Sequence, residues 1–474
     1  MNMKDTVTRR EFLSRTALTA AAGTLAAGVP LSRNVLGAND RVNLAIIGIR
    51  GQGQSHIMGF PRLPNVRVVT LCDIDENLWP RRLQMIEKSA GYVPKTASDM
   101  RKVFEDKDVD AVTFAVPNHW HALGTIWACQ AGKHVYVEKP ACWGVWEGRQ
   151  MVHAARRNNV LVQVGFQNRS RRTTIAAMNL LHSGKLGKIY MGRGLCFKPR
   201  GDIGKYPDGP MAAGEKFTLT KEGGDAFSYT QAYLDKVHYD LWIGPARNFP
   251  FNRNRFHYNW HWQWEYGNGD TGNQGPHQFD VGRWGLNKEE YPVKVRSFGG
   301  LYLYRDSAQD TPNTQTSIFE YADGTVFEFC TRGLLTPSEG AIKIGNIFYG
   351  SEGWLEIDAD GNWRTFFGRK GEPGPDSKNI PEETADALSA IGSGAGGHYG
   401  NFINAVRAGK QTDLNCDIEV GFRSSVLPCL GNISYRVGRE LKFDGKSERF
   451  ISDPEADKLL TREYRQGYAV PKLG

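Results

Sequence analysis

The first part of the chain alternates short apolar runs with polar segments of helical length. The runs are rich in Val, Ile and Leu and lie at residues 41–47, 66–72, 111–116, 134–137 and 160–164. Short apolar runs bounded by polar turns are typical of buried strands. Strands that alternate with helices form a parallel sheet covered on both faces. The pattern therefore predicts a doubly wound α/β domain over residues 39–165.

The pattern changes from residue 166 onward, where helical periodicity thins out. Residues 316–321 and 325–329 alternate apolar and polar side chains around an Asp-Gly turn, which predicts a β-hairpin. Pairs of this kind favour an antiparallel sheet with one covered face. Helical spacing returns at 398–402 and 418–437, so we expect two helices there.

Aromatic residues recur at every second position in one polar stretch. They are Tyr258, Trp260, Trp262, Trp264 and Tyr266. Alternate side chains of an extended chain share a face, so this spacing predicts a strand with five rings on one side. We expect most of these rings to pack against the sheet. His257 and His261 have a spacing that suits a metal ion on a helix, but on a predicted strand it gives no metal site.

Residues 1–38 have the layout of an export signal. The paired Arg9-Arg10 precedes Phe12-Leu13, and an uncharged stretch of small and apolar residues follows. The paired arginines resemble the twin-arginine type, so we expect a periplasmic or exported protein. An amphipathic first helix is the alternative, but the stretch has no polar face at helical spacing. After the signal, no apolar run reaches the length of a membrane span.

Composition and charge exclude several classes of protein. The 474 residues carry a net charge of +8, and the export signal contributes part of this excess. The densest later basic cluster, residues 169–172, is short and isolated, so we expect no nucleic-acid partner. The seven cysteines are scattered without a C-x-x-C pair, which argues against a disulfide framework or a zinc ribbon.

A glycine-rich turn, Gly48-Ile49-Arg50-Gly51-Gln52-Gly53, follows the first apolar run. Such a turn before a helix brings backbone N–H groups to a pyrophosphate. Arg50 replaces the middle glycine of G-x-G-x-x-G, so the turn alone also fits an ordinary strand–helix connection. Asp73 ends the second run, where a carboxylate binds two ribose hydroxyls or caps the next helix. This carboxylate favours NAD over NADP.

Polar residues also follow the later runs, at 117–121, 138–140 and 165–168. Ligands of parallel sheets bind beyond the carboxyl ends of the strands, so this placement favours a single site. The cofactor-binding candidates are Gly48, Arg50, Gly51, Gln52, Gly53, Asp73, Pro117, Asn118, His121, Glu138, Lys139 and Gln167.

These motifs resemble the Gfo/Idh/MocA oxidoreductase family over nearly the whole mature chain. The most specific is Glu138-Lys139-Pro140, and 117–121 and 275–280 add to it; residues 267–275 resemble its exported twin-arginine branch. The resemblance implies an α/β Rossmann domain followed by an α+β domain on a large open, mostly antiparallel sheet. The second domain would span residues 166–440, with helices returning to the first, and 441–474 would form a C-terminal extension. The polar segment from Ser452 onward is expected to lie over the surface. A carbohydrate substrate and a homo-oligomer are further family-level expectations.

The resemblance also assigns catalytic roles by position. Lys139 would hold the substrate hydroxyl near the nicotinamide, and His277 would exchange a proton with that hydroxyl. The family often has an Asp four residues before this histidine, but here the position is Asn273, and an amide is no general base. The substrate-binding candidates are Lys198, Arg200, Tyr258, Trp260 and Asp280, since aromatic rings suit the C–H faces of sugars.

Three functions fit these observations. The first is an exported NAD-dependent oxidoreductase that acts on a hydroxyl of a sugar, a polyol or a glycoside. The second is a redox-neutral glycosidase or lyase that retains its NAD and works through a transient keto-sugar. The third is a catalytically silent carbohydrate-binding protein, which the replacements at Arg50 and Asn273 motivate.

Overall fold

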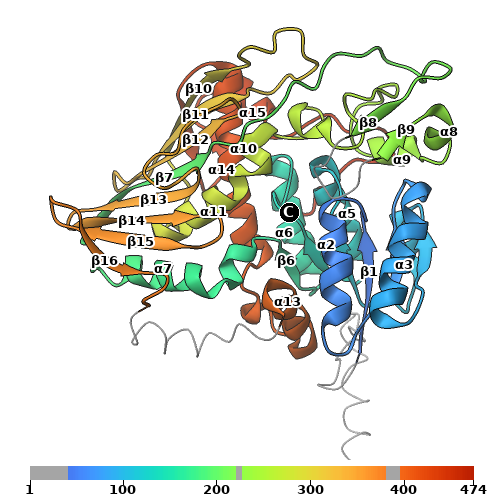
Figure 1. Ribbon diagram of the computed structural model, residues 1–474, viewed down its shortest axis with the longest axis horizontal. Helices are drawn as coiled ribbons and strands as arrows, with labels where there is room; N and C mark the ends of the chain where they lie inside the picture. Colours follow the sequence, from blue (N-terminus) through green and yellow to red (C-terminus); the bar gives the residue numbers. More distant parts are fainter. Residues whose placement is uncertain (1–40, 220–226, 381–395) are drawn as a thin grey trace, which may run out of the picture. The chain divides into compact units, whose positions relative to one another are not determined.

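The computed structural model describes residues 41–219, 227–380 and 396–474 (Figure 1). The export signal expected at 1–38 lies outside the described residues. Within the described part of the chain, no helix is both long enough and apolar enough to cross a membrane.

The first domain contains a six-stranded parallel sheet with the strand order β3-β2-β1-β4-β5-β6. Its strands are β1 (Val42–Ile47), β2 (Val66–Cys72), β3 (Lys95–Ala97), β4 (Ala111–Phe114), β5 (His134–Val137) and β6 (Val162–Val164). All five predicted runs form strands. Their side chains are buried on both faces, which explains why the runs are continuous rather than alternating. β3 was not predicted, because it is short and partly exposed.

Helices alternate with these strands, as the doubly wound pattern predicts. They are α2 (Gln52–Gly59), α3 (Trp79–Ala90), α4 (Met100–Glu105), α5 (Asn118–Gln130) and α6 (Val145–Arg157), with short 3₁₀ turns η1 (Phe60–Arg62) and η2 (Glu76–Leu78). The loops at the carboxyl ends of the strands therefore gather at one edge of the sheet.

The second domain contains a ten-stranded sheet with the order β16-β15-β14-β13-β7-β12-β11-β10-β17-β18. Its strands are β7 (Ile189–Cys196), β10 (Lys294–Gly300), β11 (Thr314–Glu320), β12 (Val326–Arg332), β13 (Ile344–Gly350), β14 (Gly353–Asp358), β15 (Trp363–Phe367), β16 (Glu372–Asp376), β17 (Leu441–Asp444) and β18 (Arg449–Phe450). Neighbouring strands are antiparallel except β7 and β12. The predicted hairpin is confirmed as β11–β12, and the Tyr321 N–H donates to the Thr325 carbonyl across its turn at 2.9 Å.

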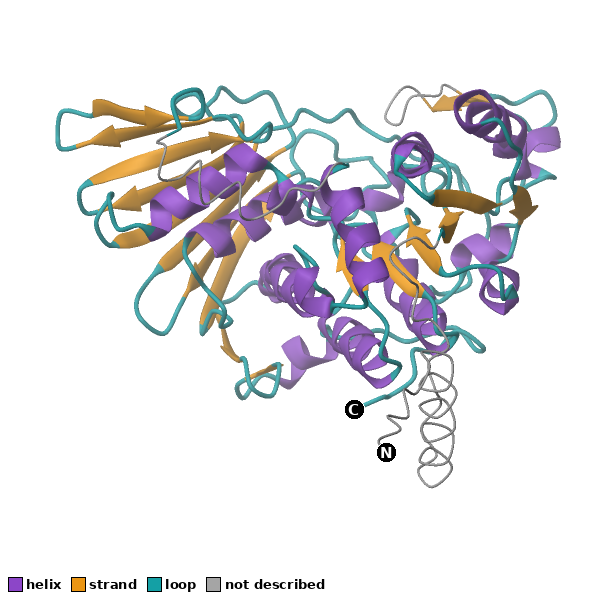
Figure 2. Cartoon of the chain, turned by 90° about the horizontal axis from the view of Figure 1, so that it is seen from below, coloured by secondary structure: helices purple, strands orange, loops and turns teal. Residues whose placement is uncertain are grey.

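Helices cover one face of this sheet (Figure 2). They include α7 (Arg172–His182), α11 (Gly275–Gly285) and α14 (Ile418–Val437); α13 (Gly397–Ala408) packs beside the turn η3 (Gln167–Ser170). The two predicted C-terminal helices are confirmed as α13 and α14. α14 also contacts α6 and β6 of the first domain, where the Ser425 hydroxyl accepts the N–H of Ala141 at 2.9 Å. The expected return to the first domain is therefore present.

The remaining smaller elements belong to neither of the two large sheets. They are β8 (Phe217–Leu219), β9 (Phe227–Tyr229), α8 (Gln231–Leu234), α9 (Tyr239–Ile243), η4 (Asn259–Trp262), α10 (Gly269–Asn273), η5 (Gln411–Asp413) and α15 (Pro454–Lys458).

The segment 441–474, which we expected to form a C-terminal extension, begins with two strands of the second sheet. It supplies β17 and β18 to the second sheet, since β17 pairs with β10. It also buries Ala456, Leu460 and Val470. The segment is mostly polar, so these few apolar residues gave no pattern from which their burial could be predicted.

The strand predicted at 258–266 is wrong. The segment forms the turn η4, and two successive N–H groups, of Tyr266 and Gly267, both donate to the carbonyl of Gln263. The N–H of Trp264 donates to the Asp310 carboxylate at 2.7 Å. The backbone groups are thus satisfied by turns and a side chain instead of a ladder, so the five rings do not share one face.

Candidate active site

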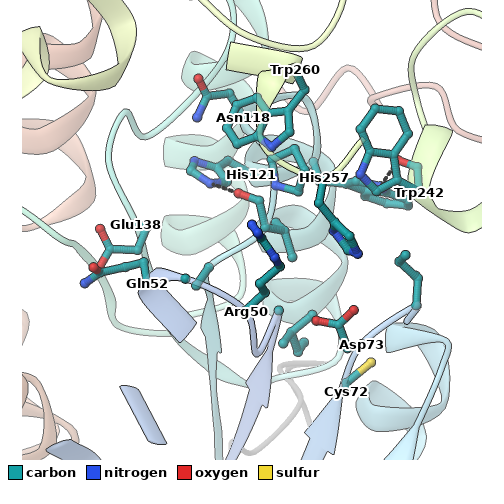
Figure 3. Close-up of a pocket in the computed structure, with 18 of the residues that line it drawn as sticks. Arg50, Gln52, Cys72, Asp73, Asn118, His121, Glu138, Trp242, His257 and Trp260 are labelled. Carbon is teal, nitrogen blue, oxygen red and sulfur yellow. Dashed lines mark hydrogen bonds between the residues drawn. The ribbon is translucent and has the colours of Figure 1, made fainter. Parts of the chain in front are cut away.

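A cavity of about 670 Å³ lies at the carboxyl ends of the parallel strands (Figure 3). Its first-domain wall holds the predicted residues Gly48, Arg50, Gly51, Gln52, Asp73, Pro117, Asn118, His121, Glu138 and Lys139. Its second-domain wall holds Lys198, Leu241, Trp242, His257, Tyr258, Trp260, His261 and Asn273. Figure 3 shows Asp73 at the strand end and Trp260 on the side away from it. One cavity therefore joins the predicted cofactor residues to several predicted substrate residues.

The glycine turn has a backbone that side chains would block. Gly48 has a φ of +81°, and a Cβ there would lie 2.5 Å from the Ala115 carbonyl oxygen. A Cβ on Gly53 would lie 1.9 Å from the Gly48 carbonyl oxygen. α2 begins at Gln52, so the positive end of its dipole borders the cavity. This close-packed turn and helix start fit the pyrophosphate of a dinucleotide.

Asp73 follows β2 directly and lines the same cavity. One of its carboxylate oxygens accepts the N–H of Ile49 at 2.8 Å, and the other accepts that of Asp75 at 2.9 Å. Burial, reinforced by the charge of Asp75, raises the pKa of Asp73 to about 7, although the two N–H groups and Arg50 act in the opposite direction. Asp73 is thus fixed where ribose hydroxyls are expected, and it gains its charge near neutral pH.

A segment of the second domain, residues 230–238, is bound to the loop that follows β2, residues 73–77. We call this segment the strap. Two main-chain hydrogen bonds, of 3.1 and 2.8 Å, join the strap to the loop. The Tyr233 hydroxyl donates to the Asp75 carboxylate at 2.6 Å, and the His257 ring lies 2.8 Å from the same carboxylate. The loop that carries Asp73 is therefore held from both sides.

The C-terminal segment also contributes to the cavity wall. Tyr468 lines the cavity, and its ring packs edge-on against Trp120 with the ring centroids 5.7 Å apart. Arg465 donates to the Gly244 carbonyl at 2.9 Å and forms an ion pair with Asp240. These contacts fix the last residues of the chain next to the site.

Glu138 lies at the end of β5 among polar partners. Its carboxylate accepts from Gln52 at 3.1 Å and from Gln167 at 3.2 Å, and the His56 ring lies 3.1 Å away. Burial acts to raise the pKa of Glu138, but the bond to His56 and the charge of Lys139 hold it below its usual value. Glu138 is thus a buried anion beside the lysine. Gln167, predicted to bind the cofactor, instead supports Glu138 and is not among the lining residues.

Lys139 reaches the second domain. Its ammonium donates to the main-chain carbonyl of Asn273 at 2.8 Å. Burial lowers the pKa of Lys139, and the nearby Lys198 and Arg200 lower it further, while Glu138 opposes this effect. The ammonium is therefore aimed into the cavity by a backbone group, and the Asn273 side chain takes no part in that bond.

Five predicted residues lie outside the set that lines the cavity: Gly53, Gln167, Arg200, Asp280 and His277. Arg200 forms a buried pair with Asp270, at 2.8 and 3.0 Å. Asp280 is fully buried and accepts from Arg169 at 2.9 Å. Both side chains thus serve the fold in this structure, and a direct substrate role does not match their placement.

Two predicted residues are held in place by the main chain or support it. His121 borders the cavity, but its two ring nitrogens lie 2.6 and 2.8 Å from the carbonyl oxygens of Pro140 and Val116. Gly53 shapes the turn without lining the cavity. Their contribution to a cofactor site is therefore positional.

Several lining residues were not predicted as site residues. They include Ser98, Arg101, His257, His261 and Tyr468. Ser98 and Arg101 follow the short strand β3, whose pattern is too weak to find. Tyr468 is distant in sequence from every motif. The two histidines were visible, but they stand on the segment that we expected to be a strand.

The fold and the cavity together define a protein with a Rossmann domain whose strand ends fit a dinucleotide. Family models agree: one described as "Oxidoreductase family, NAD-binding Rossmann fold" matches residues 42–166. A second, described as "Oxidoreductase family, C-terminal alpha/beta domain", matches residues 214–327 and 378–470. The two cover most of the chain, which belongs to the Gfo/Idh/MocA oxidoreductase family.

Individual relatives are more distant. A glycosyl hydrolase family 109 protein of Shewanella pealeana is 27% identical over 204 residues, which are 39% of this chain and 44% of that protein. A levoglucosan dehydrogenase of Pseudarthrobacter phenanthrenivorans is 27% identical over 181 residues, which are 36% of this chain and 44% of that protein. The chain thus spans less than half the length of these two relatives.

A likeness in structure extends over more of the chain. The WlbA dehydrogenase of Bordetella pertussis, solved in complex with NADH and UDP-GlcNAcA, superposes with a TM-score of 0.58. The match covers 86% of this chain and 99% of that chain at 21% identity, and it shows a common fold.

Proposed function

We propose that this chain is an NAD-dependent oxidoreductase that acts on a hydroxyl group of a sugar, a polyol or a glycoside. The observation that carries the proposal is the continuity of the cavity. The glycine turn and Asp73 line one part of it, and Lys139 and Asn273 line another. A dinucleotide and a small hydroxylated substrate would share this one space.

Different lining residues would bind different parts of the cofactor and the substrate. The turn at 48–52 would hold the pyrophosphate, and Asp73 would hold a ribose. Bound NAD supplies an acceptor for the hydride of a carbinol carbon. Lys139 binds the substrate hydroxyl and stabilises negative charge on its oxygen as the proton leaves. Tyr258 and Trp260 offer ring faces to the C–H groups of a sugar.

We further propose that the NAD stays bound between turnovers. Support comes from the strap, which ties the loop carrying Asp73 to the second domain through Tyr233, Asp75 and two main-chain bonds. A retained cofactor suits a redox-neutral reaction: a hydroxyl is oxidised to a ketone, the glycosidic bond breaks by elimination, water adds, and the ketone is reduced again. The similarity to a glycosyl hydrolase family 109 protein favours this second candidate.

Export is part of the same proposal. Residues 1–38 carry the paired arginines and the uncharged stretch of a twin-arginine signal. Because this route moves folded proteins, a chain with retained NAD would carry its cofactor along.

The first test is to purify the protein without added cofactor, release the nucleotide with acid and quantify it. About one NAD per chain supports the retained-cofactor candidate. A chain that is empty but binds added NAD supports an ordinary dehydrogenase instead. A chain without NAD affinity contradicts the whole proposal.

The second test mixes the NAD-loaded protein with free sugars, uronates, levoglucosan and aryl glycosides. NADH absorbance that rises with a free sugar supports net oxidation. Release of the aryl group without lasting NADH supports the redox-neutral reaction. Sugar binding by calorimetry without either signal favours the carbohydrate-binding alternative.

A further inference from the structure

The cavity continues past Asp73 toward the loop that follows β3. The Asp73 N–H donates to the Ala97 carbonyl at 3.0 Å, so the ends of β2 and β3 lie side by side. Residues 98–101, directly after Ala97, line the same cavity as Asp73. A ribose is expected at Asp73 and the pyrophosphate at the glycine turn. The adenine that this ribose carries would therefore extend toward residues 98–101.

Tyr468 forms part of the cavity wall beside this loop. It is among the lining residues, together with Met100, Arg101 and Trp120. The guanidinium carbon of Arg101 lies 5.9 Å from the centre of the Tyr468 ring. The rings of Trp120 and Trp127 pack against the Tyr468 ring, with centroids 5.7 and 6.2 Å away. These contacts place Tyr468 beside the start of α4 and against α5, on the side where the adenine is expected.

The segment that carries Tyr468 is anchored before and after the ring. Arg465 forms an ion pair with Asp240, and its guanidinium carbon lies 4.3 Å from the centre of the Tyr468 ring. The Tyr468 N–H donates to the Arg465 carbonyl at 3.0 Å. Further along, the Leu473 N–H donates to the side chain of Gln150 on α6 at 2.7 Å. The ring is therefore held at the cavity wall before a ligand binds, which lowers the entropy cost of binding.

The groups around this part of the cavity suit a flat, uncharged base. Tyr468 is only partly buried, and the side chains of Ile74 and Met100 line the cavity as well. An aromatic ring at a cavity wall offers a stacking surface to any base. A phosphate would need a cation here, but the Arg101 guanidinium already donates to the Asp99 carboxylate at 2.6 and 2.9 Å. The chemistry of the site therefore favours a base over a phosphate group.

We propose that Tyr468 stacks on the adenine of bound NAD. The inference rests on the proposed oxidoreductase function and gives it a further cofactor-binding residue. The glycine turn and Asp73 hold the pyrophosphate and a ribose, and Tyr468 holds the base. A segment that follows the second domain along the chain thus completes the cofactor site of the first.

The first test titrates nucleotide-free protein with NAD and with ADP-ribose by calorimetry. Tyr468→Leu keeps an apolar side chain against Trp120 but has no aromatic ring. We expect its Kd for both ligands to rise about 5- to 150-fold, the usual range when a ring that stacks on a base is removed. Tyr468→Phe keeps the ring and should bind both ligands as the wild-type chain does. Equal Kd values for Tyr468→Leu and the wild-type chain would overturn the proposal.

Two controls separate a contact with the base from a general disturbance of the cavity. Nicotinamide mononucleotide has no adenine, so its affinity should be the same for Tyr468→Leu and the wild-type chain. If its affinity falls as much as that of NAD, the proposal fails. Gln466→Ala changes an exposed side chain of the same segment and should leave the Kd for NAD unchanged. A loss as large as that of Tyr468→Leu would likewise contradict a specific role of the ring.

A fluorescence readout reports on the stacking contact itself. The etheno derivative of ADP-ribose has a fluorescent base, whose emission falls when the base stacks on an aromatic ring. We expect this fall with the wild-type chain and Tyr468→Phe, and a smaller one with saturated Tyr468→Leu. No fall with the wild-type chain would overturn the proposal whether or not Tyr468→Leu folds.

The same titrations distinguish failure of this inference from failure of the proposed function. A wild-type chain that binds none of these nucleotides refutes the oxidoreductase function, and the inference falls with it. A wild-type chain that binds NAD just as tightly without the ring of Tyr468 refutes the inference alone.

Discussion

Lys139 lines the cavity at the end of β5, and in the proposed reaction its ammonium would stabilise an alkoxide. We expect Lys139→Met to reduce kcat by about 10²- to 10³-fold, as loss of one donor to a developing oxyanion usually does. NAD binding should be almost unchanged, because Lys139 lies beyond the glycine turn. Steady-state rates and NAD titration by fluorescence measure the two effects.

The matched control for this variant is Asn273→Ala. The bond to Lys139 uses the main-chain carbonyl, which alanine retains. The rate should therefore stay close to that of the wild-type chain. A large loss in Asn273→Ala would instead give the amide side chain the catalytic role that its position first indicated.

The raised pKa of Asp73 leads us to expect that NAD binding depends on pH. Its pKa of about 7 means that the carboxyl is protonated at lower pH, and only the ionised form accepts hydrogen bonds from both ribose hydroxyls. Because binding then releases a proton, the Kd for NAD should rise about tenfold per pH unit below 7 and level off above it. Calorimetry of nucleotide-free protein measures this. In Asp73→Asn, the affinity should be lower and independent of pH over this range.

At the scale of single elements, the strap predicts slow release of the cofactor. Tyr233→Phe removes the donor to the Asp75 carboxylate, a bond to a charged group worth about 1.5–3 kcal/mol. We expect NAD to dissociate roughly tenfold faster, which a stopped-flow exchange with a fluorescent analogue would measure.

His238→Ala is the control for this variant. His238 lies on the same strap and pairs with Glu76 of the loop, but both side chains are well exposed, and such pairs contribute little. Its dissociation rate should match that of the wild-type chain. If NAD dissociates equally faster from both variants, the effect does not depend on the Tyr233–Asp75 bond in particular.

At the scale of elements, some sequence patterns predicted the structure correctly. The five buried runs and the β11–β12 hairpin were predicted because continuous or alternating burial gives a regular pattern of apolar residues in the sequence. Residues 258–266 have the same alternation for another reason. Trp260 and Trp262 are buried although they stand on a turn, and Asp310, about fifty residues later, satisfies the backbone of Trp264. Alternation alone does not reveal such a distant partner.

At the scale of the whole molecule, Asp280 joins three elements. It lies on α11, pairs with Arg169 of η3, and accepts from Ser424 of α14 at 2.7 Å. Asp280→Ala leaves the Arg169 charge buried without its partner, which typically costs about 3–5 kcal/mol. We expect a marked fall in Tm by calorimetry. Replacing both partners by apolar residues, Arg169→Met with Asp280→Leu, should recover much of the loss.

An outcome in which Asp280→Ala keeps its Tm but loses substrate affinity would restore the substrate role first assigned to this residue. The two readouts are independent, so one variant decides between them.

The candidate site was predictable where chain order determines position. Asp73, Asn118 and Lys139 stand at the ends of parallel strands, and such ends meet at one edge of a sheet. Lys198, Tyr258 and Trp260 were found by residue type and by resemblance. The strap and Tyr468 were not predictable, because their place depends on how distant segments return across the first domain, and no local pattern encodes that path.

The bond from Lys139 to the carbonyl of Asn273 has a consequence for which substitutions position 273 tolerates. Every amino acid offers the same carbonyl, so no substitution at position 273 abolishes this acceptor as long as the local backbone keeps its course. The side chain at position 273 can therefore be replaced while the Lys139 ammonium keeps its orientation. An exchange between aspartate and an amide at this position therefore leaves the acceptor of the Lys139 ammonium in place.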